Sequence, residues 1–175
     1  MTDVDHLATD SRPSKRKSPP KRQCVEVWRR DLWLCRWCAR PVIFAPVMRL
    51  LEIEVRAGGH NGPLAYSNLN WARTMSPLLD ELGATLDHVQ AHSAGGSDTN
   101  DNFCTACTKC NYRKGKSEVA YFLGRNPTKA ISSKYGDPQH WDGLSAVFTA
   151  LAARHPLGLT SADKQWLKVL ATFRP

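Results

Sequence analysis

Apolar and polar residues recur along this chain with one period typical of helices and another typical of strands. Apolar residues three or four positions apart predict amphipathic helices over residues 25–34, 47–57, 71–82, 140–156 and 160–173. A shorter helix is expected from Ser117 to the residue before Pro127, and Thr160 or Ser161 can cap the last helix. The apolar stripes of the two C-terminal segments indicate core packing, and they contain Leu144, Val147, Phe148 and Leu151, and Trp166, Leu167, Leu170 and Phe173.

Two short strands are predicted near the middle of the chain, over residues 84–89 and 102–106. The loop between them contains Gly95 and Gly96, which accept backbone angles closed to other residues and let the chain return. The strands are therefore expected to pair in antiparallel fashion. A helix should follow the second strand, starting in the turn at residues 107–110. Two strands among several helices predict the α+β fold class.

Cysteine spacing predicts a zinc site. Cys35 and Cys38 form one Cys-x-x-Cys pair, and Cys107 and Cys110 form another. Two such pairs separated by a long insert are typical of a four-thiolate structural zinc site, although the first pair alone could also be two buried free cysteines. Cys104 has the same spacing to Cys107, but we prefer Cys107 with Cys110. At position 104 the second strand should point an apolar side chain inward, and a buried cysteine suits that place.

The first residues bear on the compartment. Six cysteines would suit disulfides in a secreted protein, but the N-terminal sequence MTDVDHLATDS lacks the apolar core of a signal peptide. We therefore expect a reducing cytoplasmic location, in which paired cysteines bind metal. Uninterrupted apolar runs fall short of the roughly 20 residues that span a bilayer, so a soluble protein with no membrane partner is expected.

The formal net charge of +8 attracts polyanions and favours nucleic acid as the partner, with a solvated basic surface as the alternative. Part of this charge lies in residues 1–23, where RPSKRKSPPKR contains six basic residues and no acidic ones. The Pro and Ser content of this stretch predicts a disordered tail. Such a tail would either add phosphate contacts or merely aid solubility.

The stretch from 87 to 115 gathers side chains suited to phosphodiester hydrolysis. Imidazole titrates near neutral pH, so His88 can accept a proton from water as a general base. Asp87 and Asn111 offer hard oxygen donors, which suit Mg²⁺ or a similar ion that also binds substrate phosphate. Basic residues that could contact the phosphate backbone, or simply form a solvated face, follow on the same helix, and they are Arg113, Lys114 and Lys116.

Together these residues resemble the HNH endonucleases. The motif of that family runs through Asp-His, a Gly-Gly loop, Asn and Cys-x-x-Cys-Asn before a basic helix. Here the corresponding residues are DHVQAHSAGG, Asn102 and CTKCNYRKGKS, with the Cys35 and Cys38 pair upstream. The resemblance covers residues 35–38 and 87–117, while the insert and the C-terminal helices match nothing in it.

The resemblance implies a small ββα-metal core braced by structural Zn²⁺, and a nuclease that hydrolyses DNA to 5′-phosphate and 3′-hydroxyl ends. It implies His88 as general base, with Asp87 and Asn111 as ligands of a catalytic Mg²⁺ or Mn²⁺. Asn102 would tie the loop and orient the base. The expected organisation is a tail over 1–23, a nuclease domain over 24–125 with a helical insert at 42–84, and C-terminal helices over 126–175 packed on that domain.

Two other functions stay open at this point. A zinc-stabilised nucleic-acid-binding module would use the thiols and the basic residues without catalysis, and a protein-interaction domain would use the unmatched helices. The complete set of Asp87, His88, Asn102 and Asn111 favours the nuclease, because binding alone does not need a base beside hard metal ligands. Sequence specificity, oligomeric state and the choice between nicking and double-strand cleavage are not encoded in these motifs.

Overall fold

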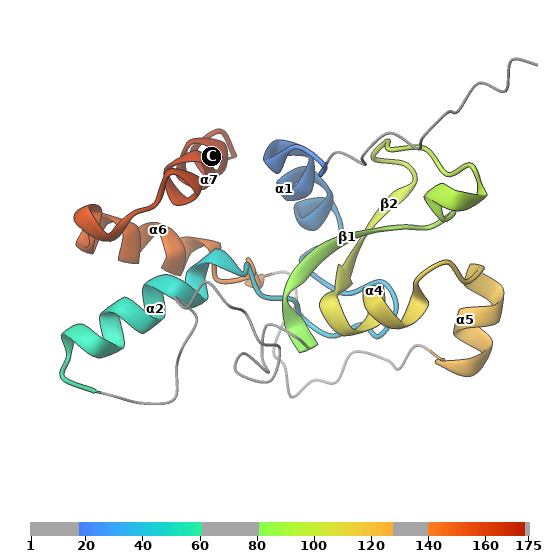
Figure 1. The fold of residues 1–175 in the computed structure, drawn as a ribbon, viewed down its shortest axis with the longest axis horizontal. Helices are drawn as coiled ribbons and strands as arrows, with labels where there is room; N and C mark the ends of the chain where they lie inside the picture. Colours follow the sequence, from blue (N-terminus) through green and yellow to red (C-terminus); the bar gives the residue numbers. More distant parts are fainter. Residues whose placement is uncertain (1–17, 61–80, 128–139, 174–175) are drawn as a thin grey trace, which may run out of the picture.

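The structure is a computed structural model that describes residues 18–60, 81–127 and 140–173 (Figure 1). Helices surround a two-stranded sheet, so the chain has the α+β class expected from its sequence. Across the described ranges, every helix is too short or too polar to cross a membrane.

The sheet pairs β1 (Ala84–His88) with β2 (Phe103–Cys107) in antiparallel fashion, as the sequence predicted. In this register His88 lies opposite Phe103. Successive side chains of a strand point to opposite faces, so Asp87 and His88 leave β1 on different sides. This alternation decides which neighbours each of the two side chains can reach.

A loop and a helix complete the central unit. The loop between the strands contains a 3₁₀ turn, η2 (His92–Ala94). Helix α4 (Thr108–Lys114) follows β2 directly. Cys107 caps this helix, because its sulfur accepts a hydrogen bond from the backbone N–H of Cys110 at 3.4 Å. The same cysteine that ends the strand therefore starts the helix.

Helix α1 (Lys21–Arg30) starts and ends earlier than the apolar pattern predicted. Leu32 and Trp33 adopt left-handed backbone angles, each with a φ of 55°. A right-handed helix cannot continue through residues with such angles. The turn leaves Leu32 exposed, although the predicted helix would have buried it, and it buries Trp33 instead. The start at Lys21 lies within the segment expected to be a tail.

Three more helices lie at one end of the molecule, away from the loop between the strands, namely α2 (Pro46–Ala57), α6 (Ser145–Arg154) and α7 (Ser161–Ala171). Helix α2 packs against α6, and α7 packs against α1 (Figure 1). Thr160 caps α7 and forms a capping box with Asp163. This box satisfies the first backbone N–H groups of the helix, which otherwise lack partners.

Aromatic rings connect these helices to the centre of the molecule. The ring centroid of the fully buried Phe44 lies 5.1 Å from that of Phe148 and 5.1 Å from that of Trp166, both in edge-on contact. Trp28 of α1 stacks on Trp166 at 5.9 Å. Val147, expected in the apolar stripe of α6, is 38% exposed, so that stripe is narrower than predicted.

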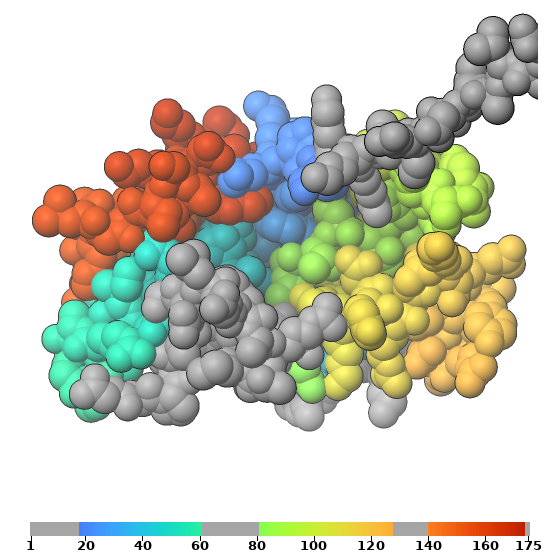
Figure 2. All heavy atoms as spheres, in the orientation of Figure 1, coloured from blue at the N-terminus to red at the C-terminus, as the bar shows by residue number. Residues whose placement is uncertain are grey.

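In Figures 1 and 2 the C-terminal helices lie at one end of the molecule, and β2, the loop before it and α4 lie toward the other end. Helices α6 and α7 are joined through η5 (Pro156–Gly158) and occupy one end, whereas α4 and α5 (Val119–Arg125) occupy the other. Most of the helix predicted over 71–82 and most of the tail predicted over 1–23 fall outside the described residues, and the last two positions of that helix, 81 and 82, are helical.

Candidate functional site

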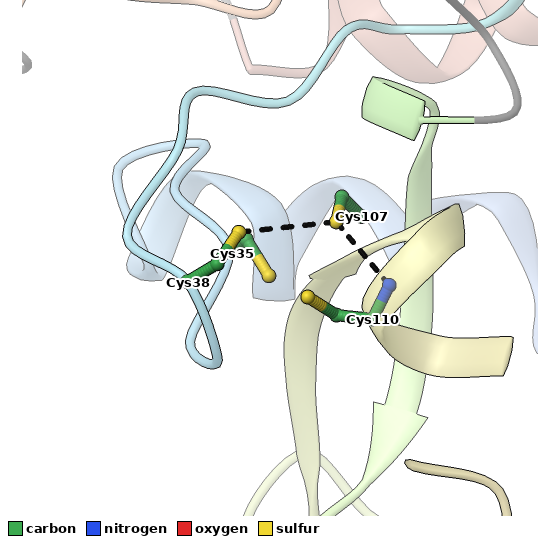
Figure 3. A group of neighbouring side chains, drawn as sticks. All are labelled: Cys35, Cys38, Cys107 and Cys110. Atoms are coloured by element: carbon green, nitrogen blue, oxygen red, sulfur yellow. Dashed lines mark hydrogen bonds between the residues drawn. The ribbon is translucent and has the colours of Figure 1, made fainter. Parts of the chain in front are cut away.

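Four cysteine side chains from distant parts of the chain point toward one another (Figure 3). Cys35 and Cys38 lie on the turn between α1 and α2, Cys107 ends β2, and Cys110 lies in the first turn of α4. The four sulfurs lie within 4.8 Å of one another, and the Sγ atoms of Cys38 and Cys107 are 3.9 Å apart. These are the same four cysteines that the spacing selected.

The arrangement of the sulfurs fits a tetrahedral zinc ion. With Zn–S bonds near 2.3 Å, the sulfurs of a tetrahedral site lie about 3.8 Å apart, and Cys38 and Cys107 are already at 3.9 Å. Hydrogen bonds among the four thiols lower the pKa of Cys107 to about 7 and also lower the pKa of Cys38, whereas they raise the pKa values of Cys35 and Cys110. A lowered pKa favours the thiolate, which is the form that binds metal. The four-cysteine cluster could therefore hold zinc.

The other two cysteines have a different environment. Cys104 is buried in β2, and burial raises the pKa of its thiol to about 12. Burial likewise raises the pKa of Cys24 to about 11. Both side chains are therefore neutral thiols near pH 7, and they serve as apolar packing groups.

Asp87 is buried near the end of β1, where its carboxylate meets two side chains from distant segments. Trp37 Nε1 donates a hydrogen bond to Oδ2 at 2.8 Å, and Lys114 Nζ lies 3.5 Å from Oδ1. Burial raises the pKa of Asp87, while Lys114 and Trp37 oppose that rise. A carboxylate has about four lone-pair sites, so these two partners leave it capacity for a further ligand.

Lys114 is buried, which corrects the expectation that it contacts DNA phosphate. Its side chain is fully enclosed, and Nζ donates to the backbone carbonyl of His88 at 2.6 Å. The ammonium also lies 5.3 Å from the ring centroid of Trp37. Position 114 is one turn beyond Asn111, and both residues face β1. Lys114 therefore braces the interior of the site, and its neighbour Arg113 is the exposed cation on this turn.

His88 contacts a carboxylate that sequence reasoning did not single out. Its Nε2 lies 2.7 Å from Oδ1 of Asp98. The imidazole is almost fully buried, with its centroid 4.5 Å from that of Phe103 and 6.0 Å from that of His92, whereas Asp98 is 56% exposed. In a neutral imidazole that donates from Nε2, the lone pair lies on Nδ1, so Nδ1 is the nitrogen that can accept a proton.

Asn102 ties the two ends of the loop together. Its Oδ1 accepts a hydrogen bond from the backbone N–H of Gln90 at 2.8 Å, and its Nδ2 donates to the carbonyls of Gln90 and Ser97 at 3.0 and 2.9 Å. Gly96 packs into the same knot, where an added Cβ would lie 1.9 Å from the Gln90 carbonyl oxygen. A residue with a side chain could not occupy that position without moving the loop.

Asn111 lies against β1 just before Asp87. Its Nδ2 donates to Thr85 Oγ1 at 3.0 Å and to the Leu86 carbonyl at 3.2 Å. Thr85 and Asp87 are two positions apart on the strand, so their side chains share the face that α4 covers. Because Nδ2 makes both of these hydrogen bonds, Oδ1 is the atom of Asn111 that a cation would bind.

Basic side chains and a shallow pocket lie beside this region. Arg113 and Lys116 are both exposed, as the sequence predicted for phosphate-contacting residues. An open pocket of about 300 Å³ separates the loop after β1 from the segment after α4, and Gln90, Lys116 and Val119 line it. Glu118 also lines this pocket, so Lys116 is balanced by an acidic residue, and Val89, the residue after His88, lies at its edge.

The strand and the helix bring the predicted residues to one region, but their side chains meet different partners. Asp87 faces the α4 side of the sheet, His88 faces Asp98, and Asn111 contacts the start of β1. Lys114 connects the first two, since its ammonium contacts both the carboxylate of Asp87 and the carbonyl of His88.

Sequence reasoning missed two residues of this site. Asp98 is one of several small polar residues in its loop, and nothing in the local pattern distinguishes it. Trp37 gave a weak signal, because a large aromatic residue between two zinc-ligand positions is more than a turn requires. Its partner Asp87 lies 50 positions away, which only the folded chain reveals.

Residues 76–117 match the family model described as HNH endonuclease. Comparison with curated proteins and with solved structures gave no significant match. The matched range contains β1, the loop, β2 and α4, and it includes two of the four clustered cysteines, while Cys35 and Cys38 lie upstream. This match confirms the resemblance to the HNH endonuclease family over residues 87–117, whereas residues 35–38 lie outside the matched range.

Proposed function

We propose that this chain is a metal-dependent endonuclease that hydrolyses phosphodiester bonds of DNA. The observation that carries the proposal is the buried His88, held by Asp98 at 2.7 Å inside the segment that matches the HNH family. A buried, carboxylate-oriented imidazole at the end of a strand suits a general base more than it suits a phosphate-binding surface, where an exposed cation would serve better.

His88 would act as the general base that deprotonates water. A carboxylate that accepts a hydrogen bond from one ring nitrogen fixes the tautomer, so that the other nitrogen can take the proton. Asp98 would play the fixing part, and the Phe103 ring packed at 4.5 Å would limit rotation of the imidazole. Asn102 would support both residues by tying the loop that carries Asp98.

Asp87 and Asn111 would hold a divalent ion, Mg²⁺ or Mn²⁺. Both residues offer oxygen atoms, the donor type such ions prefer, and α4 covers the strand face that carries Asp87. The ion would supply Lewis-acid stabilisation of the charge that develops on the phosphate and on the departing 3′ oxygen. The expected products carry a 5′-phosphate and a 3′-hydroxyl. Zn²⁺ in the four-cysteine cluster would brace the turn, β2 and α4 without taking part in the chemistry.

The DNA would bind through exposed basic residues beside the site. Lys116 lines the pocket beside Val89 and Gln90, Arg113 is exposed on the preceding helix, and the whole chain carries a net charge of +8. Contacts of this kind go to phosphate and release counterions, so binding should weaken steeply as salt rises. They carry no base-specific information.

A plasmid-nicking assay with Mg²⁺ or Mn²⁺ tests the proposal by comparing the wild-type chain with His88→Ala. The wild type should convert supercoiled DNA to nicked or linear forms. His88→Ala should cut about 10²- to 10⁴-fold more slowly, as expected when a general base is removed. His92→Ala is the matched control, since its ring lies 6.0 Å from His88 but is exposed. Equal cutting by wild type and His88→Ala would reject the assignment.

One observation favours a second function, a non-catalytic, zinc-stabilised nucleic-acid-binding module. The buried ammonium of Lys114 already compensates the charge of Asp87, so the carboxylate has a structural partner without any metal ion. This alternative predicts salt-sensitive DNA binding by the wild type in a gel-shift assay, with no cutting at any Mg²⁺ or Mn²⁺ concentration.

A further inference from the structure

We propose that Trp37 is a positioning residue that holds the Asp87 carboxylate in place for a divalent cation and thereby couples the thiol cluster to the reaction centre. This inference rests on the proposed function, because it takes Asp87 as a ligand of the catalytic ion.

The position of Trp37 is unusual for a residue inside a zinc-binding turn. It stands between Cys35 and Cys38, yet its side chain is 2% exposed and points into the protein. Its indole N–H donates to Asp87 Oδ2 at 2.8 Å, across 50 positions of sequence. A buried indole N–H needs an acceptor, and the acceptor here is the carboxylate proposed to hold the catalytic ion.

The indole is fixed on several sides. The ring of Phe122 packs edge-on against it at 5.9 Å, and the Lys114 ammonium lies 5.3 Å from its centroid. The backbone holds the turn as well, since the N–H of Arg36 donates to the Thr105 carbonyl at 2.8 Å. The N–H of Trp37 is thus held by contacts with α5, α4 and β2.

The physical consequence follows from the two oxygens of the carboxylate. Trp37 fixes Oδ2 by a short hydrogen bond from an uncharged donor, while Lys114 Nζ is a longer 3.5 Å from Oδ1. A carboxylate anchored at one oxygen presents the other in a defined direction, which lowers the cost of ordering it around an ion. Partners of this kind typically change metal affinity or activity about 10- to 100-fold when they are removed.

The same bond links two sites that the sequence keeps apart. Cys38 follows Trp37 directly and Cys35 lies two positions before it, so a change in the turn that carries them would displace the indole and its hydrogen bond. Occupancy of the thiol cluster should therefore change how tightly the other site binds a cation, although the two sites share no ligand.

The test removes the indole N–H of Trp37 and keeps an aromatic side chain at that position. Trp37→Phe keeps an aromatic side chain against Phe122 but removes the donor to Asp87. Trp141→Phe is the matched control, because its indole N–H also makes a 2.8 Å hydrogen bond, but to the backbone carbonyl of Val42 and not to Asp87. Both variants are first checked for zinc content and for cooperative thermal unfolding.

Binding of Mn²⁺ to the zinc-loaded protein is measured by electron paramagnetic resonance without DNA. Trp37→Phe should weaken Mn²⁺ binding by about 10-fold or more, and Trp141→Phe should leave it unchanged. In the cutting assay the metal concentration for half-maximal rate should rise by the same factor, while the KM for DNA stays constant. Equal Mn²⁺ affinity in the two variants would overturn the inference.

A second measurement uses the wild-type chain and does not depend on the variants folding. In a ¹⁵N-labelled sample, Mn²⁺ should broaden the indole N–H signal of Trp37 at lower concentration than that of Trp141, and Asp87→Asn should abolish the difference. Mn²⁺ that broadens both signals equally would contradict the inference even if the protein cuts DNA. Selective broadening in a protein that does not cut DNA would support the inference and reject the nuclease function.

Discussion

His88 Nε2 and Asp98 Oδ1 lie 2.7 Å apart, and they join the end of β1 to the loop that leads into β2. The imidazole is nearly buried, whereas the carboxylate is largely exposed to solvent. Exposure keeps Asp98 hydrated, and burial keeps the imidazole from turning. The pair therefore defines which ring nitrogen carries the proton, and that choice decides whether the other nitrogen can act as a base.

Asp98→Asn should slow DNA cutting by about 10- to 100-fold through kcat, because an amide can also donate to the ring and so no longer selects one tautomer. The KM for DNA should change little, since the substitution removes no basic side chain that could contact phosphate. Single-turnover cutting rates at saturating metal measure the effect.

Asp101→Asn is the control for this substitution. Asp101 lies three positions along the same loop, is exposed, and changes charge in the same way. A comparable loss of rate in both variants would mean that loop charge, and not the contact with His88, is responsible.

The central unit was predictable from sequence because its signals are local. Both strands and α4 follow from the alternation around Asp87, the glycines of the loop and the turn at Cys107, each within a few positions of the element it defines. The cysteine spacing identified the four cysteines that the structure groups together. The cap at Thr160 was equally local.

Other features depend on contacts that no short window contains. The burial of Lys114 requires a carboxylate 27 positions away, and Trp37 reaches 50 positions to the same group. From sequence, Lys114 was indistinguishable from its exposed neighbour Arg113. Helix α1 ended early because Trp33 turns back into the core, a tertiary preference that overrode the helical spacing.

Lys114→Met should reduce the free energy of unfolding by about 3–5 kcal/mol near neutral pH, because it leaves the Asp87 carboxylate buried without its cation. Adding Asp87→Asn to the same chain should recover part of the loss. Chemical denaturation of the two single variants and the double variant measures the coupling between the residues.

The loss should also depend on pH. Burial raises the pKa of Asp87 and Lys114 opposes the rise, so removing Lys114 moves that pKa further above its unfolded value. A folded pKa above the unfolded one means that stability is greatest below the unfolded pKa and falls as pH rises through the folded pKa. The deficit of Lys114→Met should therefore be larger at about pH 8 than at about pH 5. Lys109→Met serves as a control, since its ion pair with Glu81 is exposed and screened by solvent, so its loss should show no comparable dependence on pH.

Phe44→Ala should cost about 3–5 kcal/mol of stability, in line with other large-to-small core substitutions. Phe44 is fully buried and contacts both Phe148 and Trp166, so its loss should loosen α6 and α7 together. Thermal unfolding followed by circular dichroism measures it. Val147→Ala on the exposed side of α6 should change stability by less than about 0.5 kcal/mol.

Cys107→Ala should abolish zinc binding and lower the unfolding temperature, because Cys107 both belongs to the thiol cluster and caps α4. Elemental analysis of the purified protein should give about one zinc per chain for the wild type and close to none for the variant. Cys104→Ala separates metal binding from packing, since Cys104 is equally buried, lies outside the cluster and shares a Cys-x-x-Cys spacing with Cys107. It should keep its zinc, whereas loss of zinc from Cys104→Ala with retention in Cys110→Ala would assign the ligands to the other pair.

Because Trp37 lies on the same turn as Cys35, the metal-free protein should also bind Mn²⁺ more weakly, and a chelator titration followed by Mn²⁺ binding measures that coupling.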